Sequence, residues 1–146
     1  MKKLLFVCAL LVSTMGFISC SDDDDAPFDV NALEGEWYMV NWIYQDDQGK
    51  EEDNYEFNQP TENSDCSKMT ISKIDGNRYR IVQYFYWNAK WHEGSPIIIT
   101  LEGRSFTDED ETWTITSLDS NYLVIQTEGT DEDGNYYSKQ TYRKIK

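Results

Sequence analysis

The stretch KMTISKIDGNRYRIVQYFYW, residues 68–87, decides the fold class. Asp75-Gly76 is a two-residue turn signal of the kind that joins the strands of a β-hairpin. In each of the flanking segments, 68–74 and 78–87, apolar residues recur with the period of two that is typical of strands, starting with Met69 and Ile71 in the first. Four apolar residues of the second segment share one face: Tyr79, Ile81, Phe85 and Trp87. The stretch therefore predicts an antiparallel hairpin.

The rest of the chain repeats this pattern. Further strand-like segments are separated by turns rich in Gly, Asp and Asn, and no stretch shows a sustained helical period. They cover residues 37–44, 97–101, 104–107, 111–116, 122–128 and 136–145, with the acidic segment 51–57 as a weaker edge strand. Residues 88–94 are predicted to form a turn. Because the connections are short, neighbouring strands should pair antiparallel, in a sandwich or a barrel.

Aromatic residues occupy both faces of these strands. An uninterrupted alternation puts Trp37, Tyr79, Phe85 and Trp87 on one face and Tyr38, Trp42, Tyr84 and Tyr86 on the other. One face of a small barrel points inward and the other outward. The pattern hints at a binding surface, although tyrosine is also common in strands for its β-propensity alone.

Length and charge limit the function classes. A chain of 146 residues forms one domain, and its aromatic content of 14% predicts a packed core. The formal net charge of −14 argues against nucleic acid as a partner, because phosphate binding needs a basic stripe.

The first twenty residues have the features of an export signal. Met1-Lys2-Lys3 is a short basic start, and the apolar segment 4–16 is shorter than a comfortable membrane span. An uncleaved anchor helix is the alternative. Phe17-Ile18-Ser19-Cys20 resembles the signal of bacterial lipoproteins, in which the cysteine is acylated. The resemblance implies a lipid such as palmitate on Cys20 and membrane attachment through it.

An acidic run follows this cysteine directly: Ser21, Asp22, Asp23, Asp24 and Asp25. Like charges make such a run an extended, solvated spacer. The run also resembles the surface-export signal of lipoproteins of the Bacteroides group. That resemblance implies the outer face of the outer membrane, with the periplasmic face as the alternative.

The three cysteines leave no internal disulfide. Cys8 is removed with the signal and Cys20 is acylated, so Cys66 is left alone. A lone cysteine of this kind is a small buried filler or pairs between chains.

Two motifs resemble those of lipocalin-like domains. Leu33-Glu34-Gly35-Glu36-Trp37 resembles their G-x-W opening, and Thr141-Tyr142-Arg143-Lys144-Ile145 resembles their last strand. The resemblance implies an antiparallel up-and-down β-barrel over residues 33–146, after a signal peptide (1–19) and an acylated, acidic linker (20–32). It also implies that Trp37 packs at the closed end beneath Arg143 and that Gly35 belongs to the same motif. The acidic stretch 51–65 departs from the pattern.

No motif for catalysis or metal binding is complete. His92 is the one histidine and lies on a predicted turn, so a pair with Cys66 requires a meeting that nothing in the sequence indicates. The loop 131–135 has oxygen ligands and a glycine, but Tyr142 stands where an EF-hand needs glutamate. The sequence therefore predicts no cofactor and no metal.

Two function classes follow. The first is a non-enzymatic binding protein for a small apolar ligand or an envelope protein, with candidate ligand residues Tyr79, Phe85, Trp87 and Trp113. The second is a hydrolase that uses carboxylates, against which the missing nucleophile and base motifs count. A purely structural subunit of an outer-membrane complex is a third reading. An open apolar interior favours the ligand, whereas a filled interior favours a scaffold.

Overall fold

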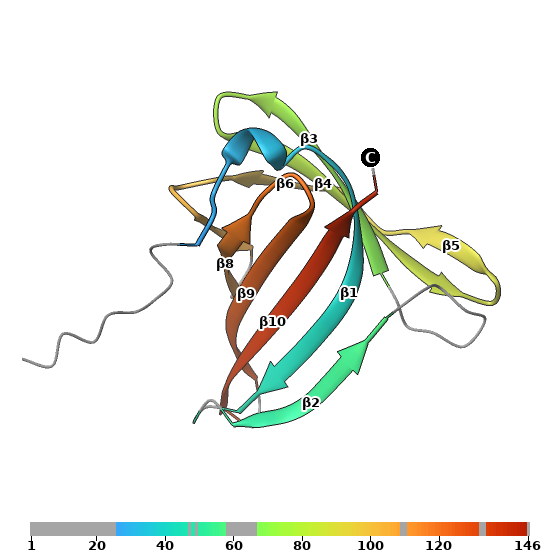
Figure 1. Ribbon diagram of the computed structural model, residues 1–146, viewed down its shortest axis with the longest axis vertical. Helices are drawn as coiled ribbons and strands as arrows, with labels where there is room; N and C mark the ends of the chain where they lie inside the picture. Colours follow the sequence, from blue (N-terminus) through green and yellow to red (C-terminus); the bar gives the residue numbers. More distant parts are fainter. Residues whose placement is uncertain are drawn as a thin grey trace, which may run out of the picture.

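The computed structural model describes residues 26–46, 48, 50–57, 67–108, 111–131 and 134–145. The predicted signal peptide, Cys20, the acidic run 21–25 and Cys66 lie outside the described residues. Within the described ranges the chain is almost entirely antiparallel β-structure (Figure 1). The elements are η2 (Val30–Ala32), β1 (Gly35–Gln45), β2 (Glu51–Glu56), β3 (Ser67–Asp75), β4 (Arg78–Trp87), β5 (Lys90–Glu93), β6 (Ile97–Thr100), β7 (Ser105–Asp108), β8 (Glu111–Leu118), β9 (Tyr122–Asp131) and β10 (Gly134–Lys144).

The strands follow one another around an up-and-down barrel. Their order along the sheet is β5-β4-β3-β1-β10-β9-β8-β7, so the last strand pairs with the first. Residues 35–38 of β1 pair with β3, and residues 41–45 pair with β2 on the same edge. In the same way β5 and β6 share one edge of β4. β2 with β3, and β5 with β6, thus act as two interrupted strands, and the expected lipocalin-like meander is confirmed.

A break in the second interrupted strand is built around Gly94. The Gly94 amide donates to the Gln83 carbonyl at 2.8 Å, and a Cβ on this glycine would lie 3.2 Å from that oxygen. Only a residue without a side chain allows this approach without displacing β4. After the break, β6 continues along β4, and just beyond β6 a bridge between Glu102 and Ser105 leads the chain into β7.

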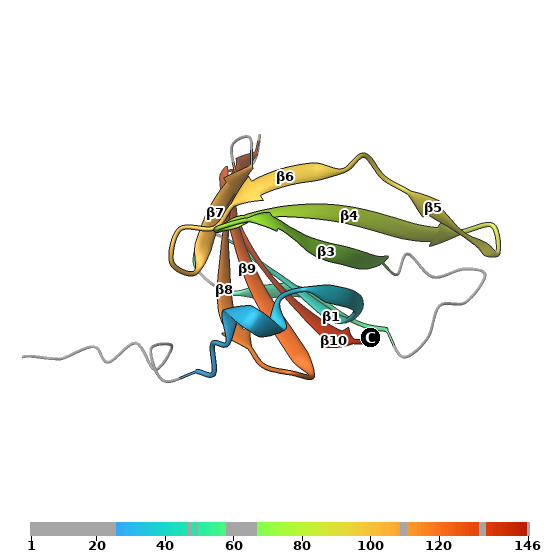
Figure 2. The same ribbon diagram turned by 90° about the horizontal axis from the view of Figure 1, so that it is seen from above.

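The core fills the end of the barrel near the start of β1. Trp37 is fully buried there, and its Nε1 donates to the Leu33 carbonyl at 2.9 Å. Side chains from eight strands pack around it: Met39, Met69, Ile71, Tyr79, Ile81, Ile99, Phe106, Ile115, Leu118, Leu123, Ile125 and Tyr142. The η2 turn lies across this end of the barrel (Figure 2). None of the helical structure among the described residues is long and apolar enough to cross a membrane.

The fold begins earlier than the predicted boundary at residue 33. Pro27 and Asp29 exchange backbone hydrogen bonds with Leu118, and Phe28 forms a parallel bridge to it. The Arg104 guanidinium lies 4.7 Å from the centre of the Phe28 ring. Residues 26–32, which the sequence assigns to a linker, therefore pack against the end of β8.

The predicted strands are present, and one predicted turn is in part a strand. The bounds of β4 match those expected from the sequence, and the weak segment 51–57 is the strand β2. The predicted turn 88–94 is wrong, because residues 90–93 form β5 and only Asn88 and Ala89 turn. Both have positive φ, 50° and 59°, so they fit the tight turn that two-residue hairpins use.

Candidate functional site

A bulge in β1 decides which aromatic residues face the interior. The register with β10 shifts between Met39 and Asn41, so that Trp42 lies opposite Gln140 and Tyr44 opposite Ser138. An extra residue reverses the alternation of a strand. Trp42 therefore shares the inner face with Trp37, and the prediction that placed it on the outer face is wrong.

The inner face of the barrel has two different halves. The half around Trp37 is the packed core. The other half, which we call the open half, belongs to the wall formed by β1, β10, β9 and β8. Its large side chains point inward but remain partly exposed, which shows that solvent reaches them: Trp42, Tyr44, Trp113 and Tyr136.

Ring contacts hold the aromatic residues of the open half in place. Trp42 packs on Tyr55 of β2 with ring centres 5.7 Å apart. Tyr44 stacks on Tyr136 at 5.7 Å with an angle of 18° between the rings. Trp113 stacks on the core residue Phe106 at 5.5 Å. Such pairs add roughly 0.5–1.5 kcal/mol each to what burial contributes.

Glu111 orients two of these rings. Its carboxylate accepts hydrogen bonds from Trp113 Nε1, at 3.0 Å, and from the Tyr136 hydroxyl. The Tyr136 ring lies across Gly129, where a Cβ would collide with the phenol oxygen at 2.5 Å. A shallow hollow of about 220 Å³ opens beside this pair on the β9–β10 hairpin.

A layer of polar side chains separates the core from the open half. The Tyr142 hydroxyl donates to Gln140 Oε1 at 2.8 Å and hydrogen-bonds with Ser67 of β3, on the other side of β1. Burial raises the pKa of Tyr142 above its usual range, and the hydrogen bond with Ser67 opposes this only in part. Thr127, from the same layer, is 3% exposed.

Two atoms of this layer lack the partners that buried polar atoms normally have. Trp42 Nε1 and Thr127 Oγ1 are both buried, and neither has a hydrogen-bond partner among the described residues. Buried polar groups without a partner are rare, since each costs free energy. These two atoms mark a place where a polar group fits.

The opposite wall, formed by β4 and β5, leans away from the barrel (Figure 2). Its inner face carries Phe85 and Trp87, whose side chains are 43% and 46% exposed. Trp87 stacks face to face on His92, with 3.3 Å between ring centres and 4° between the planes. This hairpin therefore presents an aromatic surface to solvent.

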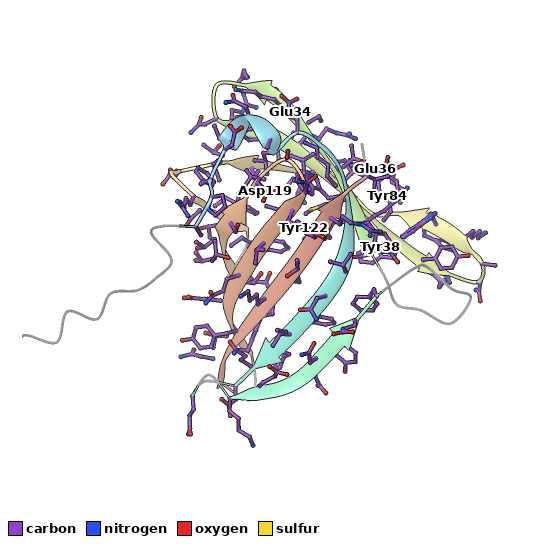
Figure 3. All side chains as sticks on the ribbon, in the orientation of Figure 1. Glu34, Glu36, Tyr38, Tyr84, Asp119 and Tyr122 are labelled. Atoms are coloured by element: carbon purple, nitrogen blue, oxygen red, sulfur yellow. The ribbon has the colours of Figure 1, made fainter. Side chains whose placement is uncertain are left out.

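A cluster on the outer face fixes the base of this hairpin. The Lys68 ammonium lies 5.1 Å from the centre of the Tyr84 ring and 5.0 Å from that of Trp91, and it pairs with Glu36 at 2.9 Å. Tyr38 contacts the edge of Trp91, with ring centres 6.5 Å apart. Glu36, Tyr38 and Tyr84 lie together beside the root of β5 (Figure 3). The cluster joins β1, β3, β4 and β5.

The predicted ligand residues do not form one group. Tyr79 is 2% exposed and belongs to the core, with Lys73 Nζ 6.0 Å from its ring centre. Trp113 lies on the open half, whereas Phe85 and Trp87 lie on the leaning hairpin. Sequence reasoning missed Trp42, Tyr44 and Tyr136, because the bulge and the cross-strand contacts carry no signal in a period-two pattern.

The cation over Trp37 is Lys144 and not Arg143. Lys144 lies opposite Trp37 in the register, its Nζ is 4.9 Å from the ring centre, and it donates to the Ala32 carbonyl at 2.7 Å. Arg143 is exposed and lies opposite Tyr38. Neighbouring residues of a strand point to opposite faces, so Arg143, one position before Lys144, points away from Trp37.

The residues considered for catalysis do not assemble a centre in the described part. His92 Nε2 is 3.3 Å from the Trp87 carbonyl oxygen, and Cys66, its possible partner, is outside the described residues. No group of three or more His, Cys, Asp and Glu residues in the described ranges is arranged to hold a metal ion.

Comparison with solved structures identifies the architecture. The siderocalin Ex-FABP, described as functioning through dual ligand specificities, aligns over 77% of this chain and 74% of its own, with 13% identity and a TM-score of 0.55. The bovine lipocalin allergen Bos d 2 aligns over 80% and 75%, with 15% identity and a TM-score of 0.54. Siderocalin Q83, described as having a dual ligand binding mode, aligns over 77% and 70%, with 12% identity and a TM-score of 0.54. No protein-family model and no curated protein sequence matches the chain. The chain has a lipocalin-like antiparallel β-barrel fold.

Proposed function

We propose that this chain is a non-enzymatic binding protein that takes a small apolar ligand on the open half of its barrel. The observation that carries the proposal is the partial exposure of inward-facing aromatic side chains, among them Trp42, Tyr44 and Trp113. Large apolar groups that face an interior and still meet water gain free energy when a ligand covers them, at roughly 25 cal/mol per Å².

The position of the core explains why the ligand occupies only part of the barrel. Trp37, Tyr79 and Ile115 fill the closed end, so this end has the packing of a structural core. The open half and the leaning β4–β5 hairpin form the remaining inner surface. The similarity to lipocalins agrees with a binding role.

We further propose that the domain is held on the outer face of the outer membrane by acyl chains on Cys20. The basic start, the apolar segment 4–16 and Ser19-Cys20 support the anchor, and the acidic residues 21–25 support surface export. The domain's excess of acidic residues agrees with a lipid anchor, because anionic headgroups repel an acidic protein.

Titration with N-phenyl-1-naphthylamine tests the ligand site. This neutral apolar probe fluoresces when it leaves water, and the wild type should bind it saturably at one site per chain. Trp113→Ala should weaken binding at least about fivefold, since a ring of the site is lost. A wild type that gives no saturable signal contradicts the proposal.

Tyr122→Ala is the matched control. Tyr122 is 46% exposed on β9, and it pairs with Arg143 away from the interior. If the probe binds on the open half, this variant should bind it with the same affinity as the wild type. Equal losses in both variants would show that the probe binds exposed aromatic residues without regard to the barrel.

A further inference from the structure

We propose that the ligand is a neutral apolar molecule with one carbonyl or hydroxyl oxygen, and that Trp42 and Thr127 receive this oxygen. The inference rests on the proposed function and specifies the chemical class of its ligand. It is carried by Trp42 Nε1 and Thr127 Oγ1, which are buried without a hydrogen-bond partner among the described residues.

The two atoms belong to one continuous stretch of the inner face. Trp42 on β1 lies opposite Gln140 on β10, and Thr127 on β9 lies opposite Ser138, two residues from Gln140. Trp113 on β8 in turn lies opposite Thr127. Trp42 and Thr127 thus lie in neighbouring rows of the inner face, among the aromatic residues of the open half, and we call this part of the inner face its floor.

The donor chemistry requires an acceptor. An indole N–H only donates, and a threonine hydroxyl donates or accepts. A ligand oxygen that accepts a hydrogen bond from each of these two groups gives both of them a partner. An alkane leaves both unpaired, so a ligand with a suitably placed oxygen should bind more tightly than one without it.

The charges around the floor select a neutral group over a carboxylate. Along the inner face of the open half, the described parts of β1, β8, β9 and β10 carry no Lys or Arg, whereas Glu111 is present and Asp53 of β2 lies opposite Tyr44. Lys90 is exposed at the tip of the leaning hairpin, and Lys144 is at the closed end. A buried carboxylate would therefore meet negative charge and no cation.

Competition between two ten-carbon compounds tests this class. Bound N-phenyl-1-naphthylamine is displaced with 2-decanone or with decanoate at pH 8. 2-Decanone should displace the probe at a concentration at least about tenfold lower, because both compounds offer an acceptor oxygen but only decanoate must bury a negative charge with no cation nearby. Equal or better displacement by decanoate overturns the inference. A probe that never binds overturns the proposed function instead.

Thr127→Val removes the hydroxyl and keeps the shape of the side chain. The variant should lose at least about threefold more affinity for 2-decanone than for the probe, which has no carbonyl oxygen. Trp42→Phe, which removes the indole N–H, should show the same larger loss for 2-decanone. Thr112→Val is the control, because Thr112 is exposed on the outer face of β8, and its affinities should not change.

Thermal unfolding without ligand gives an independent test of the premise. Replacing an unpaired buried hydroxyl by a methyl group removes an unfavourable burial, so Thr127→Val should unfold at the same or a higher temperature than the wild type. A clearly lower unfolding temperature would show that the hydroxyl already has a partner, and the inference would fail.

Discussion

Trp37 allows the closed end of the barrel to be tested quantitatively. The side chain is fully buried, its Nε1 donates to the Leu33 carbonyl at 2.9 Å, and Lys144 lies over its ring. Truncation of a buried tryptophan to alanine costs about 3–5 kcal/mol. Trp37→Phe keeps a ring but leaves the Leu33 carbonyl without this donor, so it should cost about 1–3 kcal/mol.

The assay is urea unfolding followed by far-ultraviolet circular dichroism. At about 4 °C per kcal/mol for a domain of this size, Trp37→Ala should also lower Tm by about 12–20 °C. Trp87→Ala is the control, because Trp87 is 46% exposed and its main contact is His92, so its loss should cost about 1 kcal/mol. The reasoning is refuted if Trp37→Ala costs less than Trp87→Ala.

Three further predictions concern the turn, the buried phenol and the anchor. Ala89→Gly should raise the free energy of unfolding by up to about 1 kcal/mol, because Ala89 has φ 59° where glycine is unstrained; a loss in urea unfolding would contradict this. The wild type should lose stability as the pH rises above about 10, because burial makes the folded pKa of Tyr142 higher than the unfolded one. Tyr142→Phe should remove up to about 1.4 kcal/mol per pH unit of that slope, and an unchanged slope between pH 9 and 11 would speak against it. Cys20→Ala should release the protein from the membrane fraction, and alanine at residues 22–25 should protect the domain from external protease on intact cells; unchanged fractionation or unchanged cleavage would argue against the anchor or the export signal, respectively.

The sequence was most informative where strands obey a simple alternation. Tyr79, Ile81 and Phe85 of β4 share one face, as their spacing predicts, and the strand has the predicted bounds. The turn lies one residue later than predicted, at Gly76-Asn77, because Asp75 still pairs with Arg78, and Gly76 has φ 44°. β5 was missed because it has only four residues, and because its turn uses Asn88-Ala89 in place of a glycine.

The site was harder to predict because it depends on an irregularity. The bulge after Met39 reverses the faces of Trp42 and Tyr44, and nothing in the local sequence marks it. The choice between Arg143 and Lys144 could not be read from the sequence either, since only the strand register shows which residue faces Trp37. That the Thr127 hydroxyl has no hydrogen-bond partner within the described part of the chain depends on residues far apart in the sequence.

The central claim is that a small apolar molecule occupies the open half while the closed end stays packed. The five tryptophans provide the most direct test, because each indole N–H gives its own signal in a ¹H–¹⁵N spectrum. On titration with N-phenyl-1-naphthylamine, the signals of Trp42 and Trp113 should shift and saturate together, while those of Trp37 in the core and Trp91 on the outer face should stay in place. A spectrum in which Trp42 and Trp113 do not move, or in which Trp91 moves instead, would contradict the account.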